Sequence, residues 1–143
     1  MKAKLCFESD TCQLATVRKV LRNFFSECGI PDAEAALLVL AVDEACTNVI
    51  RHAYGNQCRK VRLEMQRLRN GLRICLRDYG ASCDPGTIRP RALEDIRPGG
   101  LGVHIIRKAF DEVTYTPCAR GTRLTLFKRL PSSGKSVCPV QAT

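Results

Sequence analysis

Two alternating stretches on either side of an Asn-Gly pair constrain the fold of this chain more than any other feature. Apolar and polar residues alternate over residues 61–66, and they alternate again over residues 72–77, beyond Asn70-Gly71. Alternation of this kind around Asn-Gly is the strongest short-range signal of an antiparallel hairpin. One face of the predicted hairpin is apolar and packs on a core, whereas the other is rich in arginine. Asp78 stands where the second strand ends.

The rest of the chain predicts helices and further strands that complete the sheet. The expected elements are a strand over residues 2–8, a helix from an N-cap at Thr11 to Cys28, a helix from Pro31 to about Tyr54, a helix opened by Gly99-Gly100, and strands over residues 112–116 and 122–130. Gly29 is expected to close the first of these helices. The sequence therefore predicts an α+β fold, a two-layer sandwich with helices on one face of a mixed, mostly antiparallel sheet.

Length and local composition predict one domain and a tail. With 143 residues and 45% apolar content, residues 1–130 suffice for a single core. Residues 131–143 are rich in Pro, Ser, Gly and Lys, which predicts a disordered C-terminal tail. Residues 79–98 have no period, as is typical of a binding loop or lid. Since no run is long enough to span a bilayer and no secretory signal is visible, we expect a cytoplasmic protein.

The net charge leaves several classes of binding partner open, and the cysteine content argues against disulfides and zinc. The net charge of +9 suits an anionic partner, such as a nucleotide, a nucleic acid or an acidic protein. No basic helix or aromatic-interleaved strand favours nucleic acid. The nine cysteines are odd in number and no two have C-x-x-C spacing, so neither a disulfide framework nor a zinc site is expected.

The helix expected over residues 37–54 carries the first candidate site residues. Its predicted core-facing stripe consists of Leu37, Ala41, Ala45 and Val49. Glu44 and Asn48 are four residues apart, so they project from adjacent turns beside that stripe. The Asn48 oxygen is a neutral hard ligand suited to Mg²⁺. Glu44 would stand near that metal, where it could accept a proton from a group attacking a phosphate.

Two further groups of candidate site residues follow along the chain. Asp78 at a strand end can accept a hydrogen bond from an exocyclic amino group, and Gly80 would let the backbone approach the ring. Alone, Asp-x-Gly after a strand is usually a turn. Gly99, Gly100 and Gly102 open a helix, whose free N–H groups and dipole favour an anion such as phosphate. Together with Glu44 and Asn48, and in this order along the chain, these groups indicate a nucleotide site.

The motifs resemble those of the GHKL ATPase superfamily, within it the small anti-sigma factor serine/threonine kinases. The matching text is DEACTNVIRHAYG, RDYGASCDP, GGLGVHIIRKAFDEV and the closing strand GTRLTL. The resemblance covers about residues 2–130 and implies a Bergerat ATP-binding fold. One departure is Ser82, where the family usually has a second glycine, followed by Cys83 where an apolar residue is usual. This difference bears on the shape of the lid.

The resemblance implies a function and a set of roles. Glu44 would be the general base, Asn48 the Mg²⁺ ligand and Asp78 the group that holds the adenine amino group. The other residues implied to bind ATP are Gly80, Gly99, Gly100, Leu101, Gly102, Val103 and Thr122. The implied activity is transfer of phosphate from ATP to a serine of an anti-anti-sigma antagonist protein. The alternative state binds a sigma factor or another regulator. Family members commonly form homodimers; neither membrane nor direct nucleic-acid binding is implied.

Three alternatives stay open from the sequence. The first is a non-catalytic ATP-binding module that shapes a surface for a partner protein. The second is the catalytic domain of a sensor histidine kinase, which would need a helical domain with a phosphorylated histidine. The third is a nucleic-acid-binding protein, favoured by charge alone. The presence of Glu44, rather than Gln or Ala, favours a kinase.

Overall fold

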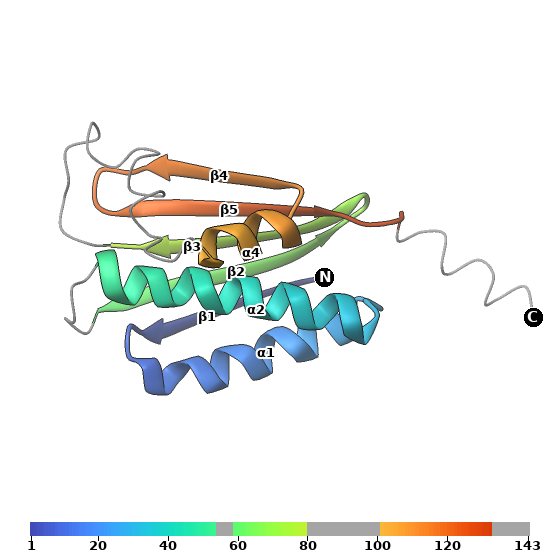
Figure 1. The fold of residues 1–143 in the computed structure, drawn as a ribbon, viewed down its shortest axis with the longest axis horizontal. Coiled ribbons are helices and arrows are strands. Elements are labelled where there is room, and N and C mark those ends of the chain that lie inside the picture. Colours follow the sequence, from blue (N-terminus) through green and yellow to red (C-terminus); the bar gives the residue numbers. More distant parts are fainter. Residues whose placement is uncertain (54–58, 80–100, 133–143) are drawn as a thin grey trace, which may run out of the picture.

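The computed structural model describes residues 1–53, 59–79 and 101–132, which form a sheet covered by helices (Figure 1). The elements are β1 (Lys2–Glu8), α1 (Leu14–Glu27), α2 (Asp32–Asn48), β2 (Lys60–Leu68), β3 (Gly71–Asp78), α4 (Leu101–Ala109), β4 (Glu112–Pro117) and β5 (Thr122–Arg129). The sheet has the order β1-β2-β3-β5-β4. The α+β prediction is confirmed, and every pairing among these strands is antiparallel.

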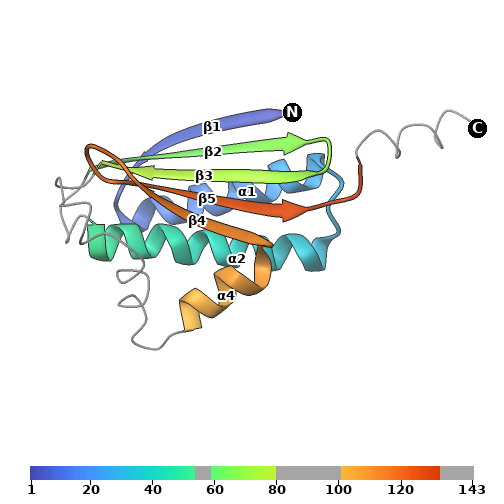
Figure 2. The same ribbon diagram turned by 90° about the horizontal axis from the view of Figure 1, so that it is seen from above.

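Helices α1, α2 and α4 lie on one face of the sheet, as Figure 2 shows. The apolar inner residues of the strands pack against them because alternate side chains of a strand point to the same face. The core includes Val17, Leu21, Phe25, Leu38, Val42, Leu63, Met65, Ile74, Ile106 and Leu126, all almost completely buried. The opposite face of the sheet is covered by no element of the described chain, so its polar side chains face solvent (Figure 2).

The predicted hairpin is confirmed as β2 and β3. Its register pairs Leu68 with Gly71 at the turn and Val61 with Asp78 at the far end. Gly71 is needed here, because a Cβ at this position would stand 2.5 Å from the ring of Phe127 on β5. The aromatic ring thus fills the space over the glycine and joins the hairpin to its neighbouring strand.

The start of the first helix differs from the prediction. The N-cap is Asp10, whose carboxylate accepts a hydrogen bond of 3.0 Å from the Cys12 backbone N–H. A 3₁₀ turn over Thr11–Gln13 follows, and α1 begins at Leu14. Aspartate at this position satisfies a free N–H group that Thr11, already inside the turn, does not. Gly29 ends the helix in the left-handed region, as predicted.

The stripe predicted for the second helix is wrong at its ends. Leu37 and Val49 are only partly buried, whereas Leu38, Val42 and Cys46 are almost completely buried. The reason is that α2 packs against both α1 and α4 as well as lying under the sheet (Figure 2), so it buries a face wider than one stripe. The helix also stops at Asn48 and continues as a π-helical turn over Val49–Ala53.

Several predicted features lie outside the described residues. They are most of the loop over residues 79–98, including Gly80 and Ser82, the glycines Gly99 and Gly100, and the tail beyond residue 132. Among the residues that the structure describes, no helix is long and apolar enough to cross a membrane.

Candidate functional site

Asn48 is the most unusual polar residue of the described chain. It is the last residue of α2, its side chain is 7% exposed, and neither its amide nitrogen nor its amide oxygen has a hydrogen-bond partner among the described residues. Buried polar groups nearly always have a partner, because an unpaired one costs about 1–3 kcal/mol. A buried amide that stays unpaired destabilises the fold, which indicates a position that binds a ligand.

The local backbone and Glu44 support this interpretation. Asn48 leads directly into the π-helical turn over Val49–Ala53, and such turns occur frequently at functional sites. Glu44 lies one helical turn before Asn48 and is partly exposed, so its carboxylate borders the same position. Between them, the buried Cys46 thiol has its pKa raised far above the ordinary value by burial, which keeps it protonated and unreactive.

Asp78 forms the second part of the site at the end of β3. It is 6% exposed, and Gly121 of the turn before β5 packs against it. A Cβ at position 121 would stand 2.1 Å from the Asp78 carbonyl oxygen and 2.7 Å from its Oδ1. Only glycine allows this approach, and its φ of +77° also favours glycine. Thr122, which starts β5, follows immediately.

Arg77 ties β3 to the same turn. Its guanidinium donates to the carbonyl oxygen of Asp78 and, at 2.8 Å, to that of Arg120. The guanidinium also lies 4.4 Å from the centre of the Tyr79 ring. These contacts tie the backbone at the end of β3 to the turn that contains Arg120 and Gly121.

Tyr115 lies on the edge strand β4, where its register partner is Leu124 of β5. Burial raises the pKa of Tyr115 to about 12, Arg107 on α4 opposes this shift, and the negative charge of Asp78 adds to it. The phenol therefore keeps its proton to a higher pH than an exposed tyrosine does.

The described residues of the predicted nucleotide site lie toward one end of the molecule. In Figures 1 and 2, the C-terminal ends of α2 and β3 and the N-terminal end of α4 lie on the same side. The helix begins at Leu101, so the backbone of Leu101, Gly102 and Val103 forms its first turn, where N–H groups lack partners within the helix. Gly80, Gly99 and Gly100 lie outside the described residues.

The donor set fits Mg²⁺ rather than a metal held by protein alone. No cluster of three His, Cys, Asp or Glu side chains occurs in the described part of the chain. Mg²⁺ needs few protein ligands when phosphate oxygens and water complete its octahedron. The unpartnered Asn48 oxygen, one helical turn from Glu44, suits this mode.

Three contributors were not singled out from the sequence. Gly121 and Tyr115 fall in ordinary strand and turn patterns, and Arg77 reads as one more solvent-facing arginine. Gly121 alone carried a signal, since Gly-Thr before an alternating strand marks a place where backbone approaches closely.

The chain belongs to the histidine kinase-like ATPase domain family, whose sequence profile matches residues 7–128. This finding confirms the superfamily that the motifs resemble, and an ATPase domain implies ATP binding.

The chain is also similar to individual proteins of this kind. The serine-protein kinase RsbW of Staphylococcus aureus is 29% identical over 111 residues, covering 71% of this chain and 70% of that protein. A solved structure of the RsbU and RsbW domains of Rv1364c from Mycobacterium tuberculosis has a TM-score of 0.66 at 18% identity. It covers 92% of this chain, which spans 34% of that longer chain. At this identity the likeness shows the fold alone.

A complex provides a third comparison. The SiaB-SiaC complex from Pseudomonas aeruginosa contains a chain with a TM-score of 0.59 at 16% identity. The match covers 86% of this chain and 88% of that one. This likeness also concerns the fold alone.

Proposed function

We propose that this protein is an ATP- and Mg²⁺-dependent protein serine/threonine kinase of the anti-sigma factor type. The observation that carries the proposal is the buried, unpartnered amide of Asn48, one helical turn beyond Glu44. A plain structural helix would place an apolar residue at Asn48, because burying an unpaired amide destabilises the fold. The similarity to RsbW of S. aureus supports the same branch of the family.

The adenine end of the proposed site is built around Asp78. Its buried carboxylate, held against Gly121, accepts a hydrogen bond from the adenine amino group. Gly80 lies beside the ring and Thr122 near it. The backbone of the first turn of α4, with the preceding glycines, binds the phosphates through its N–H groups. In this proposal the phosphate-binding residues are Gly99, Gly100, Leu101, Gly102 and Val103.

The transfer step uses the α2 pair. Asn48 would hold Mg²⁺, which would supply positive charge to the phosphate oxygens. The Glu44 carboxylate accepts the proton of the incoming serine hydroxyl as the new O–P bond forms. The bond between the γ-phosphorus and the bridging oxygen breaks, and ADP leaves with that oxygen. The protein mainly positions these groups, which is how phosphoryl transfer is commonly catalysed.

The proposed partners follow from the same branch of the family. The phosphate acceptor is a serine of an anti-anti-sigma antagonist protein, and a sigma factor or another regulator is bound in the alternative state. The active form is a homodimer. The non-catalytic module is the competing function, in which ATP only shapes a surface for the partner.

A phosphotransfer assay separates these two functions. Purified protein is incubated with γ-labelled ATP and with candidate anti-anti-sigma proteins, and ATP binding is measured in parallel. Glu44→Gln should keep ATP binding and lose about 10²- to 10⁴-fold in transfer rate, the usual contribution of a general base. Glu27→Gln on the exposed face of α1 makes the same change of charge and should have no effect. Wild-type protein that binds both ATP and a partner without any transfer would establish the non-catalytic module.

A further inference from the structure

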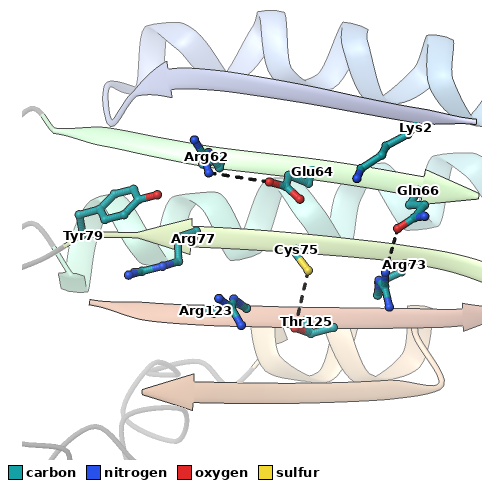
Figure 3. A pocket seen from close by; sticks show the side chains of 10 residues that line it. All are labelled: Lys2, Arg62, Glu64, Gln66, Arg73, Cys75, Arg77, Tyr79, Arg123 and Thr125. Carbon is teal, nitrogen blue, oxygen red and sulfur yellow. Dashed lines mark hydrogen bonds and ion pairs between the residues drawn. The ribbon is translucent and has the colours of Figure 1, made fainter. Parts of the chain in front are cut away.

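Three arginines form a row across the face of the sheet that is turned away from the helices. Arg62 on β2 is the register partner of Arg77 on β3, which is in turn the partner of Arg123 on β5. Figure 3 shows the three side chains on neighbouring strands. Residues directly opposite in antiparallel strands have Cβ atoms about 4.5–5.5 Å apart, and like charges at that distance destabilise a sheet. Folding alone does not explain this row.

The surroundings of the row are also cationic. Lys2 and Arg73 line the same hollow, whose volume is about 400 Å³ (Figure 3). Among the described residues that line it, Glu64 is the one carboxylate. Glu64 Oε2 lies 4.0 Å from Arg62 Nη1. Among the described residues, no carboxylate lies within 4 Å of Lys2, Arg73 or Arg123. We call the surface formed by Lys2, Arg62, Arg73, Arg77 and Arg123 the arginine face.

A second hollow extends the arginine face toward the end of the sheet. Its volume is about 540 Å³, and it shares Arg62 and Tyr79 with the first. Arg59, Lys60 and Arg120 add three further cations to its lining. Lys60 faces Glu8 of β1 in the register, so the added positive charge rests mainly on Arg59 and Arg120, at the end of the sheet that also bears Asp78 on its inner side.

We propose that the arginine face binds an acidic segment of a partner protein. Guanidinium groups match carboxylates in shape and bind them through paired hydrogen bonds, which favours Arg over Lys at such sites. The two hollows are open and adjoin each other, which suits an extended segment rather than an enclosed small molecule. The acidic segment would offset the repulsion within the row.

Two other occupants fit less well. A second copy of this chain would bring its own net charge of +9 against a cationic surface. Single-stranded nucleic acid needs aromatic rings interleaved with the cations. Here the Tyr79 ring lies under Arg77, and the Phe127 ring lies over Gly71. Tyr79 lines both hollows beside Arg62, so one ring stands at the row, and the described residues that line the hollows include no second aromatic ring to continue a stack.

The arginine face lies on the other side of the sheet from the proposed nucleotide site. Side chains alternate along β3, so Arg77 points outward while Asp78 is buried on the inner side. The inference therefore stands independently of the kinase proposal. Arg77 also contacts the Asp78 carbonyl oxygen, so the test changes Arg62 and Arg123 instead, for which the structure describes no hydrogen bond or ion pair with the groups assigned to ATP.

A binding assay with a defined probe tests the proposal. A fluorescent peptide of ten glutamates is titrated with the full chain at 0.15 M salt, beside a ten-glutamine peptide and a single-stranded oligonucleotide of thymidines. The double variant Arg62→Glu/Arg123→Glu should weaken glutamate-peptide binding about tenfold or more, through two lost ion pairs and the added repulsion. The control Lys19→Glu/Arg22→Glu changes the charge equally on exposed positions of α1 and should weaken it less than about twofold.

Each outcome decides the proposal. Selective binding of the glutamate peptide that only the sheet variant loses supports it. Equal losses in both double variants would show a general charge effect and overturn it, as would no binding of the glutamate peptide by the wild type. Tighter binding of the oligonucleotide, lost in the sheet variant, would assign the face to nucleic acid instead. Sedimentation that shows a dimer abolished by Arg62→Gln/Arg123→Gln would assign it to a second copy.

Discussion

Replacing Gly121 with alanine tests whether the turn before β5 holds Asp78 in place. A Cβ at position 121 would stand 2.1 Å from the carbonyl oxygen of Asp78 and 2.7 Å from both its carbonyl carbon and its Oδ1. Two of these atoms belong to the backbone of a central strand, so they cannot rotate away as the end of a flexible side chain would. The substitution must therefore displace either the turn or the end of β3.

The magnitude follows from two separate costs. Alanine at φ +77° adds about 1–2 kcal/mol of backbone strain, and overpacking adds about 1–3 kcal/mol. We expect Gly121→Ala to lower the free energy of unfolding by about 2–5 kcal/mol. A displaced Asp78 carboxylate also loses its proposed hydrogen bond to adenine. A hydrogen bond to a charged group contributes about 1.5–3 kcal/mol, so ATP affinity should fall about 10- to 150-fold.

Gly29 supplies a matched control for this experiment. It has the same φ of +77°, but a Cβ there would meet nothing within 4 Å. Gly29→Ala should therefore cost only the backbone strain and leave ATP affinity unchanged. Urea unfolding followed by circular dichroism measures the stability of both variants, and calorimetric titration measures ATP affinity. A Gly121→Ala variant no less stable than Gly29→Ala, or one with wild-type ATP affinity, would refute the reasoning.

Three further substitutions are informative. Asn48→Leu removes an unpaired buried amide, so it should raise the free energy of unfolding without nucleotide by about 1–3 kcal/mol. It should also abolish Mg²⁺-dependent ATP binding. A variant that unfolds at lower urea concentration than wild type would contradict this expectation. The folded-state pKa of Tyr115, about 12, exceeds the ordinary value of 10, so the folded state keeps this proton longer and stability should fall by about 2–3 kcal/mol between pH 10 and 12. Tyr115→Phe should lose that part of the pH dependence, and an unchanged profile would be the contrary result. Arg123→Gln should stabilise the fold by about 0.2–1 kcal/mol by removing a like charge opposite Arg77, and a lower urea midpoint would argue against repulsion in the row.

The sequence predicted the hairpin well because its signal is local. Alternation over two short stretches and an Asn-Gly turn determine which faces of β2 and β3 are buried, and no distant residue changes that pattern. The position of Asp78 at the strand end followed directly. The second helix was harder, since its buried face depends on how many neighbours it packs against. That number is a tertiary property, and one stripe from Leu37 to Val49 underestimated it.

In the candidate site, too, local features could be predicted from the sequence, whereas tertiary contacts could not. Glu44 and Asn48 could be proposed from their spacing on a helix, but only the structure reveals that the Asn48 amide is buried without a partner among the described residues. Contacts between remote segments gave no local signal. The approach of Gly121 to Asp78 and the electrostatic influence of Asp78 on Tyr115 join residues about forty positions apart.

Calorimetric titration with ATP, with and without Mg²⁺, tests the central claim most directly. Wild type should bind ATP more tightly with Mg²⁺. Asp78→Asn should abolish binding, Asn48→Ala should remove the Mg²⁺ dependence, and the exposed control Asp32→Asn should behave as wild type. Wild-type protein that does not bind ATP, or an Asp78→Asn variant that binds ATP with wild-type affinity, would contradict the nucleotide site described above.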